Sequence, residues 1–252
     1  MAEIRAVGFD LDGTLFDHVG AAIEGANTLF RGLGVEASER ARSVWFDAEE
    51  AGHRKWKSGE LSFQEQRRDR LRCVLPSVGL TVPDDDTLDA LFDEYLRAYR
   101  AAWKPFPGVA SALRMLRTKG LTVGVLTNGS QEQQVDKLRG IGLYDMVDVI
   151  CTAEGIGVWK PDVRAFEEFA RRLEVIPSEC LFVGDHPDQD IAGATTAGMK
   201  AVLIDHYAEN AVDLETLLET NLTRSRREHK GIDWRDAGPA QPGSNQAESP
   251  WP

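Results

Sequence analysis

The chain has 252 residues, which suits one large domain or a core with a smaller insertion, and its hydrophobic fraction of 42% is enough for a sizeable core. Its formal net charge of -12 argues against a general affinity for nucleic acid or for an anionic membrane, because both would repel it. A small anionic substrate is compatible with this charge, since a local basic pocket outweighs a distant, screened field.

The cysteines and the N-terminus indicate the compartment. Cys73, Cys151 and Cys180 form no Cys-x-x-Cys pair and lie in apolar surroundings, which predicts buried, reduced thiols. Residues 1–5 are too short and too acidic for a signal peptide, and no apolar run approaches membrane-spanning length. We therefore expect a cytoplasmic globular protein with neither nucleic acid nor a membrane as partner, while its oligomeric state stays open.

The first predicted element is a buried parallel strand at residues 6–9, because this apolar run has no helical period. It leads directly into Asp10, Asp12 and Gly13. In open α/β sheets the carboxyl ends of the strands are where ligands bind, which places both acids for chemistry. The strand period sends Asp10 and Asp12 in the same direction, so that one can act on a substrate while the other handles protons.

A run of helices follows, with no strand predicted among them. Four helices in a row between the first strand and the next indicate an inserted helical bundle, which we place at residues 17–104. Apolar residues recur at helical spacing in four stretches: 21–33, 40–57, 63–75 and 86–103.

From Pro107 onward, helices and strands alternate, which is typical of a parallel sheet. With the opening strand, the pattern predicts a doubly wound, five-stranded, Rossmann-like α/β fold. Its core should comprise residues 1–16 and 105–224, and the polar segment 225–252, rich in Gly, Pro, Ser and Gln, should be a flexible tail. The predicted helices are 109–118, 131–139, 162–173 and 191–197, and the predicted strands are 121–126, 147–152, 181–183 and 201–204.

Polar residues recur where these strands end. Thr127 and Asn128 follow the second strand and offer a hydroxyl, an amide and main-chain N–H groups just before a helix, a suitable cradle for an oxyanion. Lys160 stands before a proline that can open the next helix. Asp185 and Asp190 follow the fourth strand.

The four acids Asp10, Asp12, Asp185 and Asp190 are expected to converge on one crevice. Like charges at such distances raise one another's pKa, so the site needs a cation. Oxygen ligands of this kind suit Mg²⁺, which combines one or two carboxylates with a substrate phosphate. Lys160 would add a fixed positive charge.

These residues carry a family resemblance. The strings DLDGT at 10–14, TNG at 127–129, KP at 160–161 and GDHPDQD at 184–190 resemble, in order and separation, the four motifs of the haloacid dehalogenase superfamily of hydrolases. The resemblance covers residues 4–205. It implies a helical cap inserted just after the first motif, where the predicted bundle lies.

The resemblance also implies a phosphatase mechanism. Asp10 attacks phosphorus and forms an aspartyl phosphate, which splits a very slow hydrolysis into two easier steps. Asp12 protonates the leaving alkoxide and then takes a proton from the attacking water. Mg²⁺, Lys160, the Thr127 hydroxyl and the N–H groups around Asn128 offset the charge of the transferred phosphoryl group.

The implied magnesium ligands are Asp10, Asp12 and Asp185, with Asp12 contributing its main-chain carbonyl. Asp190 is expected beside them, where it would fix Lys160 or a metal-bound water. The leading hypothesis is thus a Mg²⁺-dependent phosphatase that acts on a small phosphorylated metabolite beneath its cap.

Three alternatives use the same residues. A dehalogenase of this fold needs no metal, but the resemblance implies that such enzymes lack a carboxylate where Asp12 stands, because displacing halide needs no proton donor. A phosphomutase shares the first step and excludes water. A non-catalytic binding module would have lost the nucleophile or the lysine, and neither is lost. The substrate stays open among a nucleotide, a sugar phosphate and phosphoglycolate.

A basic cluster within the predicted bundle contrasts with the acidic chain. It is either a solvated helix face, or one or two of its arginines reach the active site and bind a second anionic or polar group of the substrate. Trp45, Trp56 and Trp103 are core residues by default, although one of them can stack on a sugar or base. The cluster comprises His53, Arg54, Lys55, Lys57, Arg67, Arg68, Arg70 and Arg72.

Overall fold

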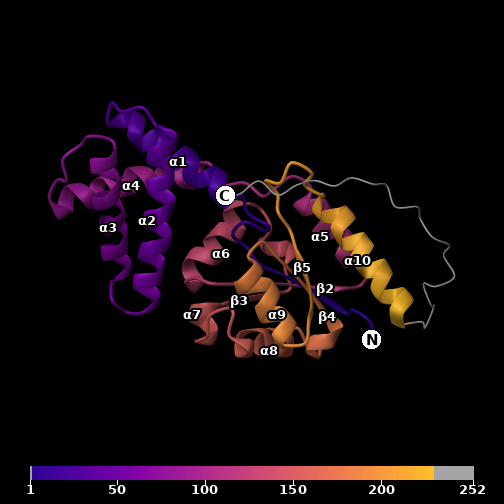
Figure 1. Ribbon diagram of the computed structural model, residues 1–252. Helices are drawn as coiled ribbons and strands as arrows, with labels where there is room; N and C mark the ends of the chain where they lie inside the picture. Colours follow the sequence, from indigo (N-terminus) through magenta and orange to yellow (C-terminus); the bar gives the residue numbers. More distant parts are fainter. Residues whose placement is uncertain (1, 230–252) are drawn as a thin grey trace, which may run out of the picture.

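A computed structural model of the protein describes residues 2–229. Its strands form one parallel sheet in the order β3-β2-β1-β4-β5, which confirms the predicted five-stranded, doubly wound α/β fold (Figure 1). The central strand β1 is entirely buried, and it pairs with β2 on one side and β4 on the other. The strands are β1 (Ala6–Phe9), β2 (Thr122–Thr127), β3 (Val149–Thr152), β4 (Cys180–Gly184) and β5 (Lys200–Leu203).

Helices cover both faces of the sheet. Alternate residues of β1 point to opposite faces and all of them are buried, so each face needs a layer of helices. Val7 and Phe9 share a core with α5 (Val109–Thr118), whereas Ala6 shares one with α8 (Val163–Arg172). Between them, Gly8 leaves the space that α8 requires, since a Cβ atom there would come within 2.4 Å of the Phe169 ring.

Four helices lie to one side of the sheet in Figure 1, and we call them the four-helix unit. They agree with the four predicted helices, and buried Trp45 packs at their centre against Phe92 and Tyr95. In the described part of the chain, no helix is both long and apolar enough to cross a bilayer. The unit consists of α1 (His18–Gly32), α2 (Glu39–Lys57), α3 (Phe63–Ser77) and α4 (Asp85–Ala101).

The two segments that join the four-helix unit to the sheet run side by side. The Asp17 N–H donates to the Lys104 carbonyl at 3.2 Å, and the Phe106 N–H donates to the Leu15 carbonyl at 3.1 Å. The unit is therefore tethered next to the carboxyl end of β1, where the first two acids lie.

The last described helix, α10 (Leu214–His229), continues past the predicted boundary at Arg224, so that boundary is too early. Every fourth residue from Leu214 to Leu222 is a buried leucine, and the helix packs against α5. The prediction used overall composition, in which the polar residues between these leucines obscure the helical spacing of the apolar ones. The rest of the predicted tail, 230–252, lies outside the described residues.

One smaller prediction is wrong, and another is confirmed with a different start. Cys73 is exposed on α3 rather than buried, although Cys151 and Cys180 are buried and all three are free. The predicted helix at 191–197 is present as α9 (Gly193–Thr196), but it begins earlier than predicted, with the wider turns of a π-helix, η3 (Pro187–Ala192). In η3 the His186 imidazole accepts the first free N–H groups of the turn.

Candidate active site

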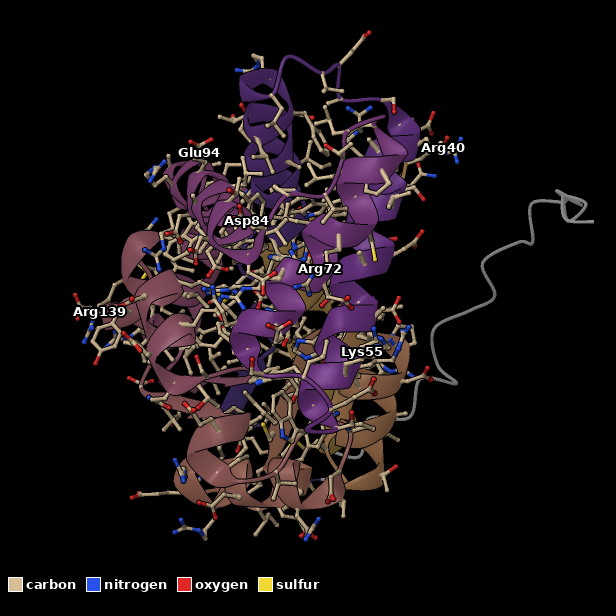
Figure 2. All side chains as sticks on the ribbon, turned by 90° about the vertical axis from the view of Figure 1, so that its left-hand side faces the viewer. Arg40, Lys55, Arg72, Asp84, Glu94 and Arg139 are labelled. Carbon is tan, nitrogen blue, oxygen red and sulfur yellow. The ribbon has the colours of Figure 1, made fainter. Side chains whose placement is uncertain are left out.

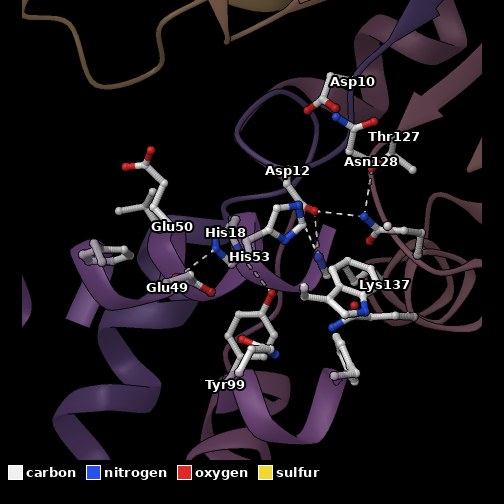
Figure 3. Close-up of a pocket in the computed structure, with 18 of the residues that line it drawn as sticks. Asp10, Asp12, His18, Glu49, Glu50, His53, Tyr99, Thr127, Asn128 and Lys137 are labelled. Atoms are coloured by element: carbon white, nitrogen blue, oxygen red, sulfur yellow. Dashed lines mark hydrogen bonds and ion pairs between the residues drawn. The ribbon is translucent and has the colours of Figure 1, made fainter. Parts of the chain in front are cut away.

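The predicted site residues meet in one cavity of about 570 Å³, between the carboxyl ends of the strands and the four-helix unit. Figure 3 shows Asp10 and Thr127 on the sheet side and Tyr99 and Glu49 on the helix side. Parallel strands present their carboxyl ends at one edge, which is why residues far apart in sequence gather here. The predicted residues that line the cavity are Asp10, Asp12, Thr127, Asn128, Lys160, Asp185 and Asp190.

Lys160 lies between two buried acids. Its Nζ atom donates to Asp10 Oδ1 at 2.5 Å and to Asp190 Oδ1 at 2.6 Å. Burial alone would lower the pKa of Lys160, but the two carboxylates outweigh burial and raise it, so the lysine stays protonated. Burial raises the pKa of Asp10 well above its ordinary value, an effect that Lys160 opposes and Asp190 strengthens.

Asp10, Asp185 and Asp190 form an acidic cluster in which one carboxylate oxygen of each lies within 4.8 Å of the others. Two glycines permit this approach. A Cβ atom on Gly13, whose φ is +92°, would stand 2.3 Å from Asp185, and one on Gly184 would stand 2.4 Å from Asp190. Three carboxylates this close, of which only Asp10 and Asp190 contact the Lys160 ammonium group, are a donor set that fits a hard divalent cation.

Asp12 faces a different partner. Lys137 Nζ donates to its two carboxylate oxygens at 2.7 and 2.8 Å, and Gln134 Nε2 donates to it at 3.1 Å (Figure 3). Burial would raise the pKa of Asp12, but the Lys137 charge, with help from His18, lowers it overall. The two acids after β1 therefore occupy electrostatically different surroundings.

Sequence reasoning missed Lys137 and Gln134. Both lie on α6 (Gln131–Gly140), three residues apart on one helix face, and both are buried, with Lys137 only 4% exposed. The sequence did contain a signal for them. The helix after Thr127 and Asn128 carries a glutamine and a lysine on its inward face, and buried polar side chains need partners.

Asn128 holds the main chain of Lys160 in place. Its Nδ2 group donates to the Lys160 carbonyl at 3.1 Å and to Gln189 Oε1 at 2.8 Å, and its Oδ1 atom accepts from the Lys160 N–H at 2.8 Å. The Asn128 side chain is thus engaged in holding Lys160 and Gln189 in place. The neighbouring Thr127 hydroxyl accepts from Gln134 at 2.8 Å and is 1% exposed.

The four-helix unit contributes a polar wall to the cavity. Arg70 Nη1 donates to Glu49 Oε1 at 2.9 Å, and His18 Nε2 lies 3.6 Å from the other Glu49 oxygen. The His18 Nδ1 atom is also 2.9 Å from the Tyr99 hydroxyl. This network joins α1, α2, α3 and α4 at the face that looks towards the sheet.

The predicted basic cluster divides into two groups. His53, Arg67 and Arg70 line the cavity. Most of the remaining members pair with acids elsewhere on the unit, and Figure 2 shows Lys55 and Arg72 on the outer face. Trp45 belongs to the core of the helices, whereas Trp56 lines the cavity. The outer pairs are Lys55 with Asp69, Arg68 with Asp89, and Arg72 with Asp85. Arg54 pairs with Glu50, which itself lines the cavity.

Glu49→Gln should make the free energy of unfolding less dependent on pH in the acidic range. Burial would raise the pKa of Glu49, but Arg70 and then His18 lower it below its ordinary value of 4.5. A carboxyl group whose pKa is lower in the folded protein than in the unfolded chain stabilises the protein at pH values above 4.5, its ordinary pKa. This stabilisation is lost as the pH falls from 4.5 towards the folded-state pKa. At pH 7 the variant should be less stable by about 1–3 kcal/mol, because the amide leaves the Arg70 charge uncompensated.

Urea unfolding at pH 7 and at pH 3.5 would measure this difference, which should shrink at the lower pH. The control is Glu94→Gln, since Glu94 is exposed and lies 4.0 Å from Arg97. A Glu49→Gln deficit that is equal at both pH values would contradict the linkage.

Comparisons with known proteins agree on one family. The family model for haloacid dehalogenase-like hydrolases matches residues 4–198. Glyceraldehyde 3-phosphate phosphatase of Methanopyrus kandleri is 32% identical, over 80% of this chain and 84% of its own. (S)-2-haloacid dehalogenase of Pseudomonas sp. strain YL is also 32% identical, over 79% of this chain and 81% of its own.

Among solved structures, the HAD-hydrolase YfnB from Bacillus subtilis, bound to magnesium, superimposes with a TM-score of 0.70. It covers 88% of this chain and 99% of its own, at 20% identity, so this likeness concerns the fold.

Proposed function

Because this chain belongs to the haloacid dehalogenase-like hydrolases, we propose that it is a Mg²⁺-dependent phosphatase that hydrolyses a small phosphorylated metabolite through an aspartyl phosphate. That the chain acts on phosphate esters follows from its family and its phosphatase relatives. The finer proposal rests on one observation: two acids two residues apart have separate partners, Asp10 with Lys160 and Asp12 with Lys137.

In this proposal, Asp10 is the nucleophile. One of its carboxylate oxygens bonds to phosphorus while the bond from phosphorus to the ester oxygen breaks, and the acid form of Asp12 gives its proton to the departing alkoxide. In the second step, Asp12 takes a proton from water as that water attacks phosphorus, which releases phosphate and frees Asp10. Lys137 favours the carboxylate form of Asp12 and so favours the second step.

Charge on the transferred group would be met by Lys160, by the Thr127 hydroxyl and by the main-chain N–H of Asn128. The Asn128 side chain has a positioning role, because it fixes the main chain from which Lys160 projects. Asp190 accepts from Lys160 with one oxygen and from the His186 N–H with the other at 3.0 Å. It is therefore suited to hold Lys160 in place.

The residues proposed to hold Mg²⁺ are Asp10, Asp185 and the main-chain carbonyl of Asp12. When bound, the ion would neutralise the acidic cluster and draw the phosphoryl group to it. The four-helix unit, residues 17–104, would act as the cap that covers the cavity and excludes bulk water.

A substrate panel tests this proposal. Purified protein with Mg²⁺ is incubated with sugar phosphates, nucleotides, short-chain phosphate esters and 2-haloacids, and released phosphate and halide are measured. We expect phosphate from at least one ester class and no halide. Halide release without phosphate release would favour the dehalogenase alternative. That alternative is included because one relative is an (S)-2-haloacid dehalogenase. Formation of an isomeric ester in place of phosphate would favour the mutase alternative.

A further inference from the structure

The cations of the cavity are unequally paired. Among the described residues, the lysines and arginines that line it are Arg67, Arg70, Lys137 and Lys160. Lys137 and Lys160 hold acids of the sheet side, and Arg70 holds Glu49 of the helix side. No described carboxylate lies within 4 Å of Arg67, and Asp93 and Asp89 act on it only from farther away. Its direct contacts are with aromatic rings.

The Arg67 guanidinium lies over two aromatic rings. Its central carbon lies 4.4 Å from the centre of the Phe63 ring and 5.4 Å from the centre of the Phe92 ring. A cation–π contact engages the face of a guanidinium, and the N–H groups of Arg67 donate no hydrogen bond to a described residue. The side chain is half-buried, so these N–H groups have also lost part of their hydration, which makes an anionic partner favourable.

The position of Arg67 would allow its N–H groups to contact the part of a bound substrate that is remote from Asp10. Arg67 projects from α3 of the four-helix unit, whereas Asp10 lies after β1, so they line opposite sides of one cavity. Arg70 pairs with Glu49, so among the described arginines of the helix side of the cavity, Arg67 is the one with no carboxylate within 4 Å. At about 570 Å³, the cavity has the size of sites that hold small metabolites.

We propose that Arg67 is a specificity-determining residue that binds a second anionic group, a carboxylate or phosphate, at the end of the substrate remote from the reacting phosphoryl group. This inference rests on the proposed phosphatase function and narrows its substrates to phosphate monoesters that carry a second negative group. Its neighbour Arg68 has no such role, because it is paired with Asp89 at 2.6 Å and with Glu65 at 2.9 Å outside the cavity.

Paired substrates test the proposal. Each pair has one carbon skeleton with either an aldehyde or a carboxylate at the far end: glycolaldehyde phosphate and phosphoglycolate, glyceraldehyde 3-phosphate and 3-phosphoglycerate, erythrose 4-phosphate and 4-phosphoerythronate. In at least one pair, kcat/KM should be higher for the acid by about 10- to 100-fold, the size of a charge-assisted, two-pronged contact.

Arg67→Met keeps an unbranched side chain and removes the charge. It should abolish the preference for the acid, mainly by raising KM, while kcat/KM for the aldehyde changes by less than about threefold. Arg67→Lys should restore part of the preference, because it keeps the charge but loses the fork. Arg68→Met is the matched control and should leave both values unchanged, with unfolding temperatures recorded for every variant.

Equal kcat/KM values within all three pairs, or an equal loss on acid and aldehyde in Arg67→Met, would overturn the role of Arg67 and leave the phosphatase proposal intact. Turnover confined to phosphate esters that carry no second anionic group, with none of the three acids and no bisphosphate hydrolysed, would overturn it as well. Absence of phosphate release from every ester of the panel would instead remove the proposed function itself.

Discussion

Asp10→Asn is expected to lower phosphatase turnover to below about 1% of the wild-type rate, because loss of a covalent nucleophile costs several powers of ten. The amide is nearly isosteric with the carboxylate but does not attack phosphorus. Lys160 keeps its second partner, Asp190, at 2.6 Å, so the protein should still fold.

Initial rates on the best ester of the panel measure this effect, and circular dichroism with thermal unfolding checks the fold. Rapid quenching of the wild type with a ³²P-labelled ester should trap label on the protein, and Asp10→Asn should trap none. The control is Asp188→Asn, since Asp188 is an exposed acid in the same loop as Asp185 and does not line the cavity. A variant at position 10 that keeps more than about 1% of the rate would contradict the nucleophile assignment.

Removal of divalent cations should abolish phosphate release, and added Mg²⁺ should restore it. The reason lies in the cluster of Asp10, Asp185 and Asp190, whose oxygens lie within 4.8 Å of one another and would repel an incoming phosphate dianion. Ca²⁺ should inhibit, because its larger and looser coordination shell allows Asp10 to bind in a geometry unsuited to in-line attack.

Rates after treatment with EDTA, with and without added Mg²⁺, measure the requirement, and calorimetric titration of Mg²⁺ measures binding apart from activity. Asp185→Asn should weaken Mg²⁺ binding and turnover together, whereas Asp188→Asn should change neither. Full phosphate release in chelator, or metal-independent halide release from a haloacid, would count against the magnesium site.

Local patterns in the chain were enough to predict the sheet and the places where its strands end. Short apolar runs separated by amphipathic helices predict parallel strands, and the structure confirms them from Ala6–Phe9 to Lys200–Leu203. Strand ends share one edge, so the positions of Asp10, Thr127 and Asp185 could be related from local pattern alone. Each of these inferences depends on near neighbours in the chain, which a sequence displays directly.

Which polar groups come into contact could not be predicted from such patterns, because it depends on how distant segments pack together. Asp12 and Lys137 are separated by 125 positions, yet their atoms lie 2.7 Å apart. Arg67 and Arg68 are adjacent, but one lines the cavity and the other pairs with acids outside it. Successive residues on a helix point about 100° apart, so the role of each side chain depends on what packs against that helix. That packing arises from contacts between distant segments, whose energies no local pattern contains.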